Sequence, residues 1–227
     1  MKWSQQAWNK ALKIYNAILE HPFLTEMAAG TLAADKFDRY LAQDEVYIGN
    51  YGRSMFALAD IIPDAAQQKL FRDFAQEGIE SEKVMHQLLI DRFGIDTDVK
   101  SSVVTSTYNR HTEAAVATGS KEIGLAAILP CAWVYNEVGI ETLRIARMEE
   151  NPYMEWMAEY GNEEFTKGVQ LLIDLADEWA GEVSEEVREK MTEAYVEATL
   201  FEYAFWDYGY FGDGKSYDYM NDIKAWL

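Results

Sequence analysis

Three polar side chains interrupt the apolar faces of long predicted helices, and together they form a set with reactive chemistry. Asp44 and Glu202 each stand where a spacing of three and four residues calls for an apolar side chain. Cys131 is the only cysteine, and it shares a helical face with Tyr135, four residues further on. A thiol can act as a nucleophile while carboxylic acids donate and accept protons. The three positions therefore suggest covalent catalysis with acid–base assistance.

The two carboxyl groups need a reason to lie on a buried face. An unpaired buried carboxylate is costly, so Asp44 requires hydrogen-bond donors or a role in binding. Glu202 is flanked by Phe201, Phe205 and Trp206. If Glu202 is buried among these rings, desolvation raises its pKa and makes it a candidate proton donor.

Pro130, which directly precedes Cys131, bears on the ionisation of the thiol. A proline inside a helix removes one hydrogen bond and kinks the chain. We expect the helix to restart near Cys131, where the positive end of the helix dipole would favour the thiolate.

Each of these positions also has a purely structural explanation. A lone cysteine on an apolar helix face is more often an inert small hydrophobic residue. A lone acidic residue in an apolar stripe is more often half-exposed or salt-bridged, and buried tyrosines and tryptophans usually belong to the core. One pocket that satisfies Cys131, Asp44 and Glu202 together would account for all three, which favours the chemical interpretation.

Metal and phosphate chemistry fit the sequence less well. Glu82 and His86 are four residues apart, with Glu77 and Glu80 nearby. A di-iron bundle needs Glu-x-x-His pairs from two helices, but this segment holds one histidine at the wrong spacing. We interpret Glu82 and His86 as a pair on a helix surface and predict no metal. Glycine-rich phosphate loops and nucleophile elbows are absent from the sequence.

The segments that carry these residues are predicted to be helical throughout. Apolar residues recur at three and four, and no segment alternates as a strand would. The prediction is an all-α fold, one helical bundle formed by a single domain over residues 1–227. The expected helices are Trp3–Glu20, Leu24–Ala29, Asp35–Asp60, Asp64–Phe93, Ser102–Thr118, Ser120–Met148, Pro152–Tyr160, Glu163–Ala180, Ser184–Tyr210 and Tyr217–Trp226.

The composition narrows the choice of partners and compartment. A formal net charge of -19 opposes binding to nucleic acid and to anionic membranes. The first residues, MKWSQQAWNK, lack the apolar run of a signal peptide, and we expect no apolar stretch long enough to span a membrane. With one cysteine, the expected location is the reducing cytoplasm.

Four segments give the chain a resemblance to a known family. HPFLTEMAAGTLAADKFDRYLAQDEVYI, LPCAWVYNEVG, YMEWMAEYGNEEF and ATLFEYAFWDYGY occur in this order over nearly the whole chain. The sequence resembles the cysteine-containing branch of the TenA / thiaminase II family. The resemblance implies a haem-oxygenase-like fold without haem, a homotetramer, and hydrolysis of an aminomethyl-substituted aminopyrimidine from degraded thiamin, with thiamin itself a slower substrate.

The resemblance also implies a role for individual residues. The nucleophile falls on Cys131, the carboxylate that anchors the pyrimidine on Asp44, and the acid–base glutamate on Glu202. The segment VVTSTYNRHTEAA departs most from the family pattern, which affects Tyr108. Aromatic residues that the resemblance places around the substrate are Tyr47, Tyr108, Tyr135, Tyr160 and Phe205.

The expected partner is a small pyrimidine, and the implied reaction requires no metal or organic cofactor. Two alternatives stay open from the sequence. One is a non-catalytic protein that binds a pyrimidine or has a regulatory role. The other is a relative of the same fold that depends on a redox cofactor or metal.

Overall fold

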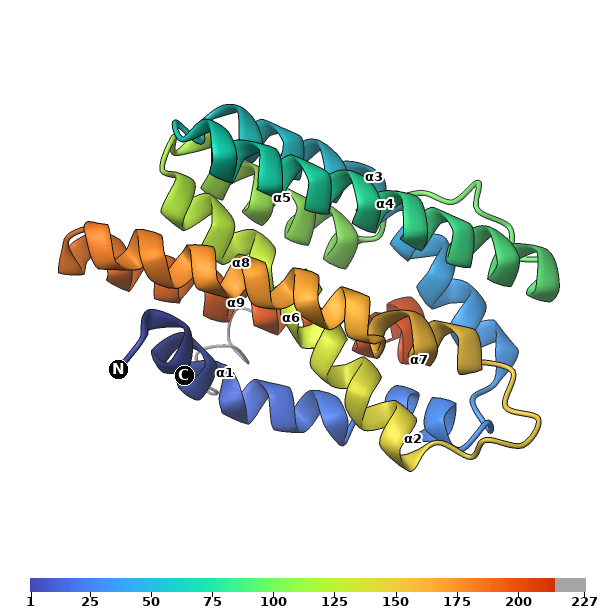
Figure 1. Ribbon diagram of the computed structural model, residues 1–227. Coiled ribbons are helices and arrows are strands. Elements are labelled where there is room, and N and C mark those ends of the chain that lie inside the picture. Colours follow the sequence, from blue (N-terminus) through green and yellow to red (C-terminus); the bar gives the residue numbers. More distant parts are fainter. Residues whose placement is uncertain (215–227) are drawn as a thin grey trace.

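The computed structural model describes residues 1–214, and within them it contains helices and no strand (Figure 1). The predicted helix Tyr217–Trp226 lies outside the described residues. The elements are α1 (Trp3–Leu19), α2 (Pro22–Ala28), α3 (Ala34–Asp60), α4 (Ala65–Phe93), α5 (Val103–Ala117), α6 (Lys121–Ile145), α7 (Met154–Tyr160), α8 (Glu163–Glu182), α9 (Glu185–Phe211) and a 3-10 turn, η1 (Gly212–Gly214).

Local capping chemistry sets most of the helix boundaries. Side chains before six helices accept hydrogen bonds from backbone N–H groups of the first turn, which would otherwise have no partner. Gly94 ends α4 with φ 69, a left-handed conformation that glycine adopts without strain. These signals are visible in the sequence, and for the nine α-helices within residues 1–214 the predicted boundaries lie within three residues of the observed ones. The capping residues are His21, Asp64, Ser102, Ser120, Asn162 and Ser184.

Pro130 does not interrupt α6, so the predicted restart of the helix at Cys131 is wrong. A proline removes one hydrogen bond from a helix, yet α6 continues through this position from Lys121 to Ile145. Tyr51 of α3 adds support at this point, because its hydroxyl donates to the carbonyl oxygen of Ile128 at 3.2 Å. Cys131 therefore lies in the middle of a helix and not at its positive end.

α6 is the central helix of the bundle, and it packs most extensively on α9. In Figure 1, α3, α4 and α5 lie on one side of these helices, and α1 and α2 lie on the other. By length and composition α6 could span a membrane, contrary to the sequence expectation, but 72% of its apolar window is buried inside the bundle. Its position at the centre explains its apolar character.

α6 and α7 approach each other through two glycines. A Cβ atom on Gly139 would lie 2.5 Å from the backbone nitrogen of Gly161, so only glycine fits there. This contact fixes the end of α7, where Tyr160 stands, against the middle of α6.

Candidate functional site

A cavity of about 220 Å³ lies between the middle of α6 and the helices α3, α4, α7 and α8. Its wall includes the thiol-bearing Cys131, two tyrosines, Tyr51 and Tyr160, and the carboxyl-bearing Glu82. Of the residues proposed from the sequence, Cys131 and Tyr160 line this cavity directly. The others lie behind them in one connected cluster.

Glu202 is buried and hydrogen-bonded to Tyr108. Its side chain comes from α9 and is 1% exposed, and the Tyr108 hydroxyl of α5 donates to its Oε1 at 2.5 Å. Burial raises the pKa of Glu202 to about 8, the bond from Tyr108 opposes this, and the charges of Asp44 and Glu82 add to it. Glu202 therefore carries a proton at neutral pH, as its aromatic neighbours in the sequence suggested.

Asp44 is also buried, and it has the donors that its position requires. The hydroxyl of Tyr40, one helical turn earlier on α3, donates to Asp44 Oδ2 at 2.9 Å. The Tyr40 hydroxyl lies 3.3 Å from that of Tyr135 and accepts a bond from Trp156 Nε1 at 3.3 Å. Asp44 Oδ2 lies 3.4 Å from Nε2 of His86.

His86 is completely buried, so its assignment to a helix surface was wrong. Its Nδ1 lies 2.5 Å from Glu45 Oε1, and its Nε2 lies 3.9 Å from Glu82 Oε1. Burial alone would lower the pKa of His86, but the contacts with Asp44 and Glu45 and the charge of Glu82 raise it to about 10. The imidazole is therefore a cation at neutral pH, enclosed by three carboxyl groups.

Glu82 and His86 were not predicted from the sequence to be site residues. Their spacing of four is equally typical of an exposed pair, and the pattern of α4 does not separate the two cases. A buried Asp44 requires donors, but the sequence contains no feature that assigns His86 to this task.

The same side chains have spacing suitable for a metal ion. Asp44, Glu82 and His86 each offer one ligand atom, and these atoms lie within 4.8 Å of one another. His86 also lies at ion-pair distance from Asp44 and from Glu45, and we describe these side chains as an ion-pair network.

Cys131 is a thiol in this environment. Burial raises its pKa well above the ordinary value, and the charges of Glu202, Glu82 and Asp44 raise it further, while the nearby Tyr47 hydroxyl acts in the opposite direction. The expectation of a thiolate favoured by the helix dipole is thus wrong, since the helix does not begin at Cys131.

Aromatic rings connect the remaining candidates. Tyr47 lies 4.8 Å from Tyr108 and 5.8 Å from Phe205 between ring centroids, and Tyr135 lies 4.9 Å from Tyr160. The Tyr160 hydroxyl donates to Glu82 Oε1 at 2.6 Å. Flat walls with hydroxyl donors can hold a small aromatic ring.

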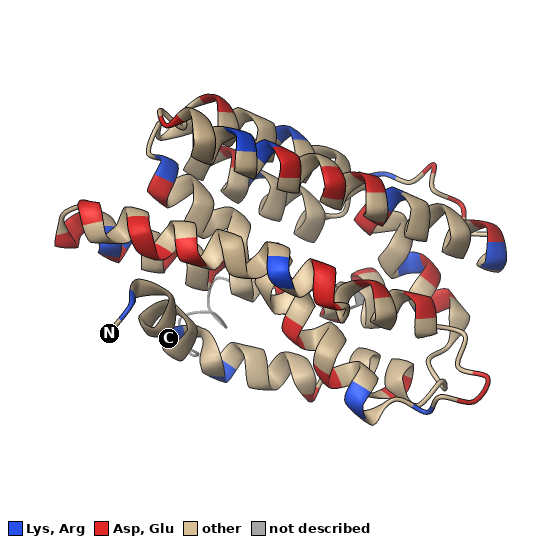
Figure 2. Ribbon diagram, viewed as in Figure 1, with Lys and Arg blue, Asp and Glu red and all other residues tan. Residues whose placement is uncertain are grey.

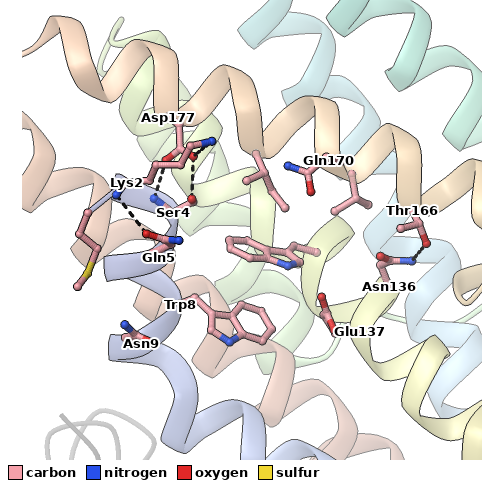
Figure 3. A pocket seen from close by; sticks show the side chains of 14 residues that line it. Lys2, Ser4, Gln5, Trp8, Asn9, Asn136, Glu137, Thr166, Gln170 and Asp177 are labelled. Atoms are coloured by element: carbon pink, nitrogen blue, oxygen red, sulfur yellow. Dashed lines mark hydrogen bonds and ion pairs between the residues drawn. The ribbon is translucent and has the colours of Figure 1, made fainter.

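A larger pocket of about 640 Å³ lies against α6 between α1 and α8, and none of the candidate residues lines it (Figure 3). Trp8 stacks on Trp133 there at 4.6 Å. Asn136 connects this region to the smaller cavity, because its Nδ2 donates to the carbonyl oxygen of Tyr160 at 2.8 Å and to Thr166 at 2.9 Å. This side of α6 supports the position of Tyr160.

Comparison with known proteins identifies the family. Residues 8–211 match the sequence profile of the TENA/THI-4/PQQC family. The chain belongs to this family. A relative from Bacillus subtilis, named aminopyrimidine aminohydrolase, is 30% identical over 99% of this chain and 96% of its own length. The resemblance seen in the sequence is therefore confirmed.

Solved structures confirm the fold. A TenA homologue from Pyrococcus furiosus superimposes with a TM-score of 0.87 at 24% identity, over 92% of this chain and all of that one. A domain with a heme oxygenase-like fold from Shewanella denitrificans gives a TM-score of 0.71 at 15% identity, over 93% and 96% of the two chains. The all-helical, haem-oxygenase-like prediction is correct for the described residues.

Proposed function

We propose that this TenA-family protein is an aminopyrimidine aminohydrolase that cleaves an aminomethyl-substituted aminopyrimidine to the hydroxymethylpyrimidine. The observation that carries the proposal is one cavity with a thiol in its wall, backed by a proton-bearing carboxylic acid and an ion-paired carboxylate. A relative with 30% identity bears the name of this activity. We also propose that the protein forms a homotetramer and that it acts in the cytoplasm.

The sulfur of Cys131 is the proposed nucleophile. Direct displacement by water at the methylene group of an electron-poor ring is slow. Addition of sulfur to a neighbouring ring carbon makes the ring electron-rich, so that it can expel the amine. Because the pKa of Cys131 is raised, the sulfur loses its proton as it attacks and is not a thiolate beforehand. The ring nitrogen that receives the displaced electron pair takes up this proton, and the sulfur regains it when it leaves the ring.

The two carboxyl groups have separate tasks in this reaction. Asp44 hydrogen-bonds the ring nitrogen and the exocyclic amine, which orients the ring and stabilises the charge that develops on it. Glu202 gives its proton to the leaving amine and then accepts one from the incoming water. A pKa of about 8 suits both steps near neutral pH. These steps use side chains alone and need no cofactor.

The proposal is tested by incubating the protein with the aminomethylpyrimidine and with thiamin and comparing kcat/KM. We expect the aminomethylpyrimidine to be the better substrate. Cys131→Ala should abolish turnover, while calorimetry should find product binding within a few-fold of wild type, since the sulfur is not a binding anchor. Wild-type kcat in this variant would refute the covalent route. Binding without turnover in the wild type would favour the non-catalytic alternative.

A further inference from the structure

We propose that His86 is a positioning residue of this site, a buried imidazole that holds Asp44 and Glu82 in the orientation in which they meet the pyrimidine substrate. This inference rests on the proposed function. It adds two residues that sequence reasoning assigned to the surface, and it gives the anchoring carboxylate a fixed partner.

The geometry around His86 is that of one cation shared by carboxylates from two helices. On α3, Asp44 Oδ2 lies 3.4 Å from Nε2 and Glu45 Oε1 lies 2.5 Å from Nδ1. On α4, Glu82 Oε1 lies 3.9 Å from Nε2, one helical turn before His86. Within residues 1–214, His86 is the only basic side chain that forms an ion pair with Asp44 or Glu82.

The two ring nitrogens have different roles in this arrangement. Nδ1 contacts Glu45, which is half-buried and lies outside the cavity wall. This contact fixes the rotation of the imidazole ring. With the ring fixed, Nε2 is directed toward Asp44 and Glu82. His86 thus links α3 and α4 and fixes the positions of the carboxyl groups at the pocket.

Glu82 extends the effect of His86 to the cavity wall. Its Oε1 accepts the hydroxyl proton of Tyr160 at 2.6 Å, and both Glu82 and Tyr160 line the cavity. The contacts between His86 and Glu82 and between Glu82 and Tyr160 therefore join α4 to the end of α7. Loss of the cation would leave Asp44 and Glu82 as two close, unpaired carboxyl groups that repel each other.

Several other titratable groups influence this network, and any pH effect includes them. Those that face it or lie next to its carboxylates are Tyr40 and Tyr51 on α3, Lys83 on α4, Cys131 and Tyr135 on α6, Glu159 and Tyr160 on α7, and Glu202 on α9.

The chain contains a matched control. His21 is also buried, and its Nε2 pairs with Asp207 Oδ1 at 3.3 Å between α2 and α9. None of the residues that line the cavity takes part in this pair. His21→Gln and His86→Gln remove the same chemical group from two buried pairs, only one of which belongs to the site.

The experiment measures the Kd of the hydroxymethylpyrimidine product by calorimetry from about pH 6 to about pH 9, together with kcat, KM and Tm. In His86→Gln we expect Kd and KM to rise on the order of 10- to 100-fold, with a smaller change in kcat. The pH dependence of Kd should also differ from that of wild type, because the substitution removes the titratable His86 from the network. His21→Gln should lower Tm and leave Kd and its pH profile unchanged.

Glu45→Gln is a second variant that keeps the test decisive if His86→Gln does not fold. Glu45 is half-buried, and its removal frees the ring of His86, so a smaller rise in Kd in the same direction is expected. If Kd and its pH profile match wild type in the folded variants, the positioning role is overturned. Stoichiometric Mn²⁺ or Fe²⁺ binding that depends on His86 would overturn it as well.

The proposed function and this inference fail in different ways. A wild-type protein that neither binds nor hydrolyses the pyrimidines overturns the function, and with it this inference. A wild type that binds them, with variants of unchanged affinity, overturns the role of His86 alone.

Discussion

Cys131 and Glu202 both hold their protons at neutral pH, so proton transfer belongs to the chemical step itself. A site of this kind protects its sulfur from reaction with other molecules, because an uncharged thiol is a weak nucleophile. The buried cation His86 partly offsets the negative charge of the surrounding carboxylates. Each ionisation state follows from burial and neighbours and not from residue type alone.

Glu202→Gln isolates the proton donor. We expect kcat to fall on the order of 10²- to 10⁴-fold with a smaller rise in KM, since the side chain keeps its size and loses its acid. In wild type, kcat should decrease as the pH rises through about 8, where Glu202 loses its proton. The variant should lack this decrease. Steady-state kinetics across pH measure both effects.

The control for this variant is Glu197→Gln, an exposed change on the same helix that should leave kcat and its pH profile unchanged. An effect of Glu202→Gln on KM alone would make Glu202 a binding residue. Stability provides an independent check, because the folded pKa of Glu202 is raised above the ordinary value of 4.5. Its contribution is present in full below about pH 4.5 and is lost as the pH rises through about 8.

At the residue scale, the sequence predicted which acidic residues belong to the site better than it predicted the side chains they contact. Asp44 and Glu202 could be recognised because each breaks an apolar stripe within its own helix. His86 could not, since its burial depends on how α4 packs against α3, and an i, i+4 pair reads the same on either face of a helix. Resemblance to the family supplied the roles of the aromatic residues, which spacing alone would have assigned to the core.

At the scale of elements, capping residues made the helix boundaries predictable, whereas Pro130 led to an error. The effect of a proline on a helix depends on the support of its neighbours, and α6 is enclosed on several sides. The close approach of α6 and α7 was equally hidden, because nothing local distinguishes Gly139 from an ordinary helical glycine.

Gly139→Ala tests how the contact between α6 and α7 positions Tyr160. The new Cβ would lie 2.5 Å from backbone atoms of Tyr160 and Gly161, which cannot rotate away. We expect the free energy of unfolding to fall by about 1–3 kcal/mol and KM to rise because Tyr160 shifts in the cavity wall. Urea denaturation and steady-state kinetics measure the two effects.

Gly49→Ala on α3 is the matched substitution, because a Cβ there meets no atom within 4 Å. It should be neutral or stabilise the protein by up to about 1 kcal/mol, as alanine generally does in an exposed helix. If Gly139→Ala behaved like Gly49→Ala, the α6–α7 contact would not determine the position of Tyr160.

At the scale of the whole molecule, charge is the feature that the sequence gives directly and the fold then distributes. The net charge is -19, and Figure 2 shows Asp and Glu along α8 and near its junction with α7. Four carboxyl-bearing residues line the cavity, and its lining includes no lysine, arginine or histidine. They are Glu77, Glu82, Glu159 and Glu164.

This distribution predicts that salt weakens capture of a cationic substrate. Free in solution, the aminomethyl group of the proposed substrate is an ammonium at neutral pH, so the acidic lining attracts it, and added salt screens that attraction. The group releases one proton to solvent as it binds, and Glu202 protonates the amine when it leaves. Between about 0.01 M and about 0.3 M NaCl, kcat/KM should fall roughly 2- to 5-fold, with kcat nearly constant. Inhibition by the uncharged hydroxymethylpyrimidine should change less.

Glu164→Gln should reduce the salt dependence, whereas Glu163→Gln, exposed on the same helix but outside the lining, should not. Equal salt dependence for the charged substrate and the uncharged inhibitor would mean that the acidic lining does not select the cation.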